Sequence, residues 1–154
     1  MAICDLNELK GLLAADARLM GLDLGTKTIG IAVSDVNRTI ATARTTLRRT
    51  KLSRDIETLR AMTAADGIGG IVVGLPVNMD GSEGPRAQSA RDTAARLAEG
   101  LALPVAFWDE RWSTVAAERA MIDADLSRRK RARVVDQVAA AYILQGALDR
   151  LRAA

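Results

Sequence analysis

The alternation of hydrophobic and polar positions predicts a first half of the chain made of short strands. Three strands are expected, at residues 18–24, 28–34 and 40–47. In the second of these, Ile29, Ile31 and Val33 alternate with small side chains, so the large and small residues face opposite sides of the strand. The turns 25–27 and 35–37 between the strands are short, and the pattern therefore predicts an antiparallel meander.

In the second half of the chain, segments with apolar residues at helical spacing alternate with short, continuous apolar stretches. We expect helices at 51–65, 85–99, 113–124 and 132–152 and buried strands at 71–75 and 103–108. The segments 76–85 and 126–131 read as connections, the second of them basic, and a short helix at 6–16 precedes the first strand. The order predicts a mixed α/β sheet with helices on its faces, in one domain over residues 1–154 with 1–16 as a helical extension.

The apolar stripe of the final helix indicates which of its faces packs on the sheet. The periodicity assigns that stripe to Val135, Val138, Ala139, Tyr142, Leu148 and Leu151.

Composition excludes several classes of protein. Of the 154 residues, 49% are hydrophobic and 27% charged, which is typical of a globular domain. Cys4 is the single cysteine, so no intramolecular disulfide can form. No apolar segment approaches the ~20 residues of a membrane span, and the N-terminus lacks the pattern of a signal peptide. We therefore expect a cytoplasmic protein without a membrane partner.

The absence of histidine restricts the chemistry further. It excludes Ser-His-Asp and Cys-His catalysis and any zinc site with histidine ligands. A catalytic site would have to use carboxylates, Lys, Arg or hydroxyl groups. Side-chain metal ligands would be oxygens, which favours Mg²⁺ or Mn²⁺.

The net charge of +3 is unevenly distributed. Two basic clusters stand out, one of Arg128, Arg129, Lys130, Arg131 and Arg133, the other of Arg44, Arg48, Arg49, Lys51 and Arg54. Such clusters suit a nucleic-acid backbone, but they also occur as solvated surface.

Asp23 is the strongest candidate for chemistry, because it is the one acid in a segment that reads as a buried strand. An unpaired buried carboxylate costs several kcal/mol by rough estimate, so a cation, hydrogen bonds or a metal ion must compensate it. The alternative is a structural aspartate that caps the turn at Gly25.

Two further positions carry acids where a site could form. Asp109 and Glu110 follow a predicted strand, where ligands gather in open α/β sheets, and alternation places their side chains on opposite faces. Both could instead pair with Arg111 in a loop. Asp136 lies one turn into the predicted final helix, on the face shared by Ala140 and Ile143, where a helix-dipole role is the alternative.

Together, these acids could converge at one end of the sheet. Carboxylates held close together repel one another unless protonated or bridged by cations, and a pair of Mg²⁺ ions ~3.5–4 Å apart suits such a cluster. Such a site would hydrolyse phosphodiester bonds, which needs positioned charge and no histidine. The glycine-rich loop after residue 74 would add the Asn78 amide and the Ser82 hydroxyl as phosphate or nucleotide contacts, and the alternative is an ordinary surface loop.

Four blocks of sequence resemble one family. They are residues 21–35 (GLDLGTKTIGIAVSD), 73–85 (VGLPVNMDGSEGP), 109–114 (DERWST) and 136–144 (DQVAAAYIL). In this order they resemble the YqgF/RuvX family of bacterial RNase H-like proteins, which are described as pre-16S rRNA nucleases and earlier as Holliday junction resolvase homologues.

The resemblance implies specific assignments. Asp23, Glu110 and Asp136 would occupy the catalytic, metal-binding positions, with Glu110 chosen over Asp109. The sheet would be five-stranded in the order 3-2-1-4-5, with strand 2 antiparallel to the rest. We expect an endonuclease for the 5′ side of precursor 16S rRNA, with Arg111 and the basic loop (Arg128, Arg129, Lys130 and Arg131) on phosphates.

Two other functions stay open on the sequence alone. One is a resolvase of branched DNA, which would favour a homodimer over a monomer. The other is a nucleic-acid-binding module without turnover.

Overall fold

A computed structural model describes residues 3–112 and 128–153, with side chains in the second segment from residue 135 onward. The strands are β1 (Ile3–Cys4), β2 (Arg18–Leu24), β3 (Thr28–Ser34), β4 (Ala41–Arg48), β5 (Ile68–Leu75) and β6 (Val105–Asp109). The helices are α1 (Leu6–Leu12), α2 (Leu52–Asp66), α3 (Pro85–Leu101), the 3₁₀ helix η1 (Glu110–Trp112) and α5 (Arg128–Ala153). The predicted helix 113–124 lies outside the described residues.

The sheet confirms the predicted strand order and adds one strand. Its order is β1-β6-β5-β2-β3-β4, and β3 runs antiparallel to β2 and β4 while β5 and β6 run parallel to β2. The prediction of five strands was wrong, because β1 pairs in parallel with β6 through Ile3 and Cys4. A strand of two residues is too short to show any periodicity.

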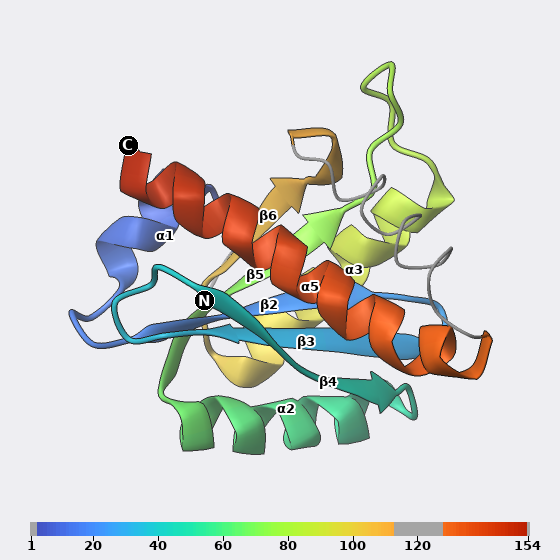
Figure 1. Ribbon diagram of the computed structural model, residues 1–154, viewed down its shortest axis with the longest axis horizontal. Coiled ribbons are helices and arrows are strands. Elements are labelled where there is room, and N and C mark those ends of the chain that lie inside the picture. Colours follow the sequence, from blue (N-terminus) through green and yellow to red (C-terminus); the bar gives the residue numbers. More distant parts are fainter. Residues whose placement is uncertain (1–2, 113–127, 154) are drawn as a thin grey trace.

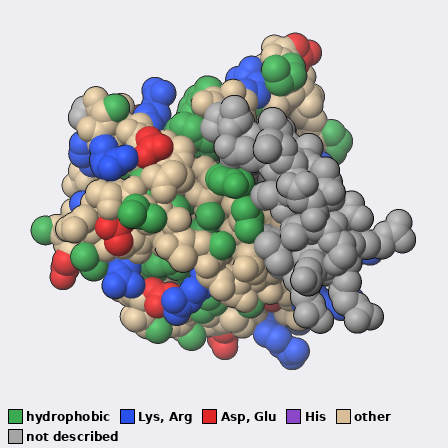
Figure 2. Space-filling view, viewed as in Figure 1, with side chains coloured by type: hydrophobic (Ala, Val, Ile, Leu, Met, Phe, Trp, Pro, Cys, Tyr) green, Lys and Arg blue, Asp and Glu red, His purple; other side chains and the backbone are tan. Residues whose placement is uncertain are grey.

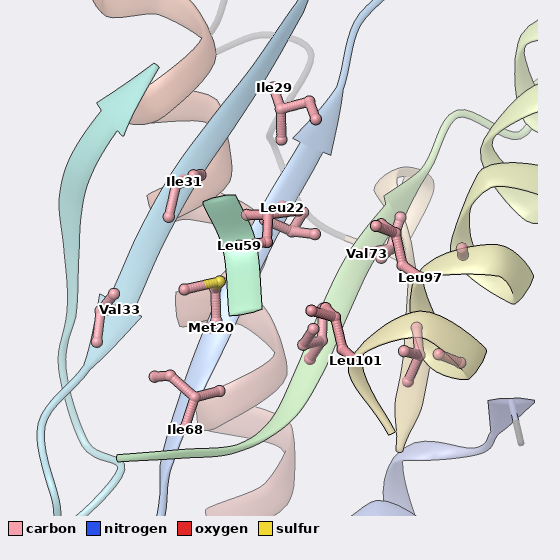
Figure 3. Close-up of a cluster of buried hydrophobic side chains, with 14 residues drawn as sticks. Met20, Leu22, Ile29, Ile31, Val33, Leu59, Ile68, Val73, Leu97 and Leu101 are labelled. Carbon is pink, nitrogen blue, oxygen red and sulfur yellow. The ribbon is translucent and has the colours of Figure 1, made fainter. Parts of the chain in front are cut away.

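Helices cover both faces of the sheet, as Figure 1 shows. On one face, α5 crosses the sheet and α1 lies beside its C-terminal end, with a core that includes Leu9, Trp108 and Leu144. On the other face, α2 and α3 bury Leu59, Leu97 and Leu101 (Figure 3). The side chains that face them come from β2, β3 and β5 and include Met20, Leu22, Ile29, Ile31, Val33 and Val73. The expected separation of large and small residues in β3 is confirmed, since Ala32 belongs to the core under α5.

The N-terminal helix is part of this core. Asp5 and Glu8 form a capping box at its start. Leu9 is fully buried, and Lys10 Nζ donates to the Leu151 carbonyl oxygen at 2.8 Å. The helix ends at Leu12 rather than residue 16, because Leu13 adopts an extended conformation and the chain turns back into β2.

Two other boundaries differ from the prediction for identifiable reasons. Gly67 ends α2 in the left-handed conformation, as expected, but β5 begins at Ile68 rather than Ile71. Gly69 and Gly70 read as helix breakers, yet they lie in the strand, where side chains of the N-terminal segment pack closely over them. The final helix begins at Arg128, within the predicted loop 126–131, because Arg and Lys are good helix formers and no Pro or Gly interrupts them.

The contact face of α5 matches only part of the predicted stripe, in which Ala139, Leu148 and Leu151 are buried as expected. Val135, Val138 and Tyr142 are only half-buried. The fully buried residues are Ala139, Ala140, Ile143, Leu144, Ala147 and Leu148. Small residues contact the sheet here because the helix lies very close to it.

Within the described residues, no helix is long and apolar enough to cross a membrane.

We predict that Leu9→Ala lowers the free energy of unfolding by about 2–5 kcal/mol, because it leaves a cavity between α1 and β5. Leu12→Ala is the matched control, since 53% of Leu12 is exposed. Denaturant titration of both variants measures the difference. An equal, small effect of the two substitutions would show that α1 is not part of the core.

Candidate active site

Asp23 is a buried carboxylate on the face of the sheet that α5 covers. Only 5% of the residue is exposed. Side chains alternate along β2, so Asp23 shares a face with Gly21, which meets Ala140 and Leu144 of α5. Leu22, between them, belongs to the opposite core. Asp23 therefore points toward the helix near the carboxyl end of β2.

Asp136 reaches the same place from α5. The hydroxyl of Thr28 at the start of β3 donates a hydrogen bond to its carboxylate. The Asp136 carbonyl oxygen lies so close to Gly30 that a side chain there would overlap it. Gly30 is also the register partner of Asp23 across β2 and β3. The two acids thus flank a single glycine.

The position of Asp136 within α5 removes its alternative role. The helix begins at Arg128, so Asp136 lies more than two turns inside it rather than in the first turn. The helix dipole acts mainly on the terminal turn, and it gives little reason for an acid at this position. The expected orientation toward the sheet is confirmed, because Ala140 and Ile143 on the same face are fully buried.

The structure gives the side chains of the adjacent residues Asp109 and Glu110 different surroundings. Asp109 ends β6 and accepts hydrogen bonds from the backbone and side chain of Arg111, with a shortest ion-pair distance of 2.7 Å. This guanidinium holds the pKa of Asp109 below its usual value. Glu110 begins η1, and its Oε2 lies 3.5 Å from the point where a Gly74 Cβ would stand. Gly74 belongs to β5, the strand beside β2, so Glu110 approaches Asp23 from the other side.

These positions surround the end of β2, but they do not form a closed metal site. Among residues 3–112 and the described side chains of α5, no group of three acids is close enough to hold one ion. Mutual repulsion opposes such a cluster unless a cation bridges it. The donor set is nevertheless the one that Mg²⁺ or Mn²⁺ prefers, since every candidate ligand is a carboxylate oxygen.

The loop between β5 and α3 contacts the same region through Arg111. Asn78 Nδ2 donates to Ser82 Oγ at 3.1 Å, and the Ser82 hydroxyl donates to Asp80 Oδ1 at 2.6 Å. The bonds from Ser82 lower the pKa of Asp80. Arg111 Nη1 lies 3.6 Å from the position of a Cβ on Gly81. The predicted phosphate contacts Asn78 and Ser82 are thus held by internal bonds, in a loop that reaches the residue next to Glu110.

The basic residues Arg128, Arg129, Lys130 and Arg131 form the first turns of α5 rather than a loop. Their side chains lie outside the described part of the structure. In Figure 1 the first turns of α5 lie at the end of the molecule where β2 ends and β3 begins, and Thr28 at the start of β3 bonds to Asp136.

Three residues support these positions, of which the sequence analysis named only Arg49, as part of a basic cluster. Thr28 holds Asp136, Gly30 admits the helix backbone, and Arg49 Nη1 donates to the Gly25 carbonyl oxygen at 2.7 Å in the turn after Asp23. The small residues on one face of β3 were a usable signal for Gly30. Thr28 and Arg49 depend on long-range contacts that carry no local pattern.

A family model described as "RuvX: Holliday junction resolvase" matches residues 17–150. The chain belongs to the RuvX family. A relative from Cereibacter sphaeroides is 61% identical to this chain, over 95% of this chain and 91% of the relative. One from Paramagnetospirillum magneticum is 59% identical over 92% of each chain. One from Chelativorans sp. is 54% identical over 99% of this chain and 96% of the relative. Each bears the name "Putative pre-16S rRNA nuclease".

The solved structures confirm the RNase H-like fold of this RuvX-family chain. The structure "T. thermophilus RuvC in complex with Holliday junction substrate" superimposes with a TM-score of 0.54 over 88% of this chain and 96% of that one. A second Thermus thermophilus RuvC structure gives a TM-score of 0.53. Identities of 13% and 12% limit the likeness to the fold.

Gly30→Ala tests the close approach of α5 in this RuvX-family chain. We expect a loss of about 1–3 kcal/mol in the free energy of unfolding, because the added methyl group meets backbone that has no room to move. Gly11→Ala is the control. Its new Cβ meets nothing within 4 Å, and it should stabilise α1 by up to about 1 kcal/mol. Denaturant titration that ranks the two variants equally would contradict this packing.

Proposed function

We propose that the chain is a Mg²⁺- or Mn²⁺-dependent endonuclease that processes the 5′ end of precursor 16S rRNA in the cytoplasm. The observation that carries the proposal is the convergence of Asp23 and Asp136 on the two sides of Gly30, with Glu110 approaching over Gly74. The names of the relatives support rRNA as the substrate. We further propose that residues 1–154 form one nuclease domain, because α1 shares its core with α5.

Asp23, Glu110 and Asp136 are the residues that would hold the metal. Bound there, Mg²⁺ or Mn²⁺ would activate water and stabilise the charge that develops at phosphorus. The burial of Asp23 excludes bulk water around its carboxylate, which strengthens its attraction for a cation. The Thr28 hydroxyl orients the Asp136 carboxylate by donating to it.

Arg111 would position the substrate rather than take part in proton transfer. Its Nε and Nη2 donate to Asp109, and its Nη1 lies near Gly81 of the loop 76–84. About a third of its side chain, 32%, remains exposed. A phosphate oxygen next to the cleaved bond could accept from this group, and the basic first turns of α5 would contact further phosphates.

A resolvase of branched DNA is the second candidate. The printed description of the RuvX family favours it, as does the shared fold with a RuvC bound to a Holliday junction. The chemistry would be the same, and the difference would lie in the polymer and in the need for two active sites, as a homodimer provides.

The test is a cleavage assay with wild type and Asp23→Asn on precursor 16S rRNA and on a four-way DNA junction, with and without Mg²⁺. We expect cleavage of the rRNA by wild type only when Mg²⁺ is present. Even the outer partners of a metal site contribute roughly 10–100-fold, so Asp23→Asn should lose more than about 100-fold while folding normally. Asp92→Asn, on the exposed side of α3, is the matched control.

Each other outcome identifies a different function. Symmetric nicking of the junction, without rRNA cleavage, would show a resolvase. Tight binding without cleavage of either polymer would show a binding module. Full activity of Asp23→Asn would disprove the site as assigned.

A further inference from the structure

The structure changes the membership of the second basic cluster of the sequence. Arg44 leaves the cluster, because it pairs at 3.2 Å with Asp66 at the C-terminal end of α2. Lys27 joins it, because the Arg49 backbone N–H donates to the Lys27 carbonyl oxygen at 2.8 Å. We call the resulting group the basic corner. Its members are Lys27, Arg48, Arg49, Lys51 and Arg54.

The basic corner adjoins the candidate active site through strand pairing and one side-chain hydrogen bond. Arg48 is the register partner of Thr28, whose hydroxyl holds Asp136. Arg49 Nη1 donates to the carbonyl oxygen of Gly25, two residues after Asp23. From there the corner continues to Lys51 and Arg54, where α2 begins. In Figure 1 the β2–β3 turn, the end of β4 and the start of α2 lie at the same end of the molecule.

The charges of the corner are available to a ligand. Lys27, Arg48, Lys51 and Arg54 are exposed, and none of these four forms an ion pair with any acid in the described part of the chain. Figure 2 shows basic side chains that project into solvent at the edge where α2 begins in Figure 1.

The nearest acid does not neutralise this group. Asp55 is buried, and its carboxylate accepts from the Thr50 backbone at 3.0 Å and from the Thr50 hydroxyl at 2.6 Å. These bonds tie the carboxylate to Thr50 at the junction between β4 and α2, so it stabilises the backbone of the basic corner. Five cations with one buried acid make a local positive field.

We propose that the basic corner binds the phosphate backbone of the polynucleotide that lies across the active site, on the side of the cleaved bond nearer to β4. The proposal rests on the proposed nuclease function. Exposed Lys and Arg side chains contact phosphates without reading bases, so the corner contributes affinity and register but no sequence preference. It extends the substrate path from the active site toward β4, away from the loop 76–84 and Arg111, which lie on the side of β5 and β6.

Such contacts have a quantitative signature in salt dependence. Each phosphate contact changes the slope of log K against log salt by about 0.7 for a single strand. Replacing three cations with Gln should therefore reduce the slope by about 2. If the salt dependences of the two proteins converge at 1 M, affinity at 0.1 M should fall by about 100-fold.

The experiment is a fluorescence-anisotropy titration in the Asp23→Asn background, in which substrate stays intact. The test protein carries Arg48→Gln, Lys51→Gln and Arg54→Gln. The control carries Arg60→Gln, Arg96→Gln and Arg152→Gln, which removes the same charge elsewhere. Arg49 is left in place because it holds the turn after Asp23. The probes are a single-stranded RNA from the precursor 5′ region and a four-way DNA junction, and circular dichroism confirms folding.

The two proposals fail in different ways. A reduced slope with either probe, absent from the control, supports the corner, and the probe bound more tightly at 0.1 M salt identifies the polymer. Slopes equal to those of the control with both probes would overturn the corner, even if the wild type cleaves RNA. Failure of wild type to cleave either polymer, together with a reduced slope, would overturn the nuclease and leave the corner as a binding site.

Discussion

The close packing of α5 on a glycine-lined face of the sheet is the constraint on which the site depends. Gly30, Gly21 and Gly74 lie on adjacent strands, and a side chain at any of them would meet Asp136, Leu144 or Ile143 of the helix. Interiors pack too densely to absorb such overlaps without displacement. The glycines therefore set the depth of the helix, and that depth brings Asp136 against Gly30, the register partner of Asp23.

The same packing explains why charged groups occur at an otherwise apolar face. Asp23 is buried beneath the helix that carries Asp136, and Glu110 enters over Gly74 because that strand has no side chain in the way. Asp109 is withdrawn from this group by its ion pair with Arg111. One acid of the Asp109–Glu110 pair thus orients an arginine while the other approaches Gly74. In the proposed nuclease, the first would serve a phosphate contact and the second a cation site.

How far the sequence predicted this structure depended on the range of the interactions involved. The alternation in 28–34 predicted β3 correctly, and Gly67 marked the end of α2. The strand order came from the family resemblance and is confirmed apart from β1. The contact face of α5 was predicted only in part. The start of α5 and the bond from Thr28 to Asp136 were not predicted, because they depend on how closely two distant segments approach. The roles of Asp23, Glu110 and Asp136 in metal binding remain predictions.

The most direct measurement is the anomalous X-ray scattering of Mn²⁺ in crystals of the protein grown with that ion. Our account predicts a Mn²⁺ peak with carboxylate oxygens of Asp23, Glu110 and Asp136 at about 2.0–2.3 Å, and no such peak in crystals of Asp23→Asn. A peak coordinated by other residues, or none at these three acids in the wild type, would contradict it.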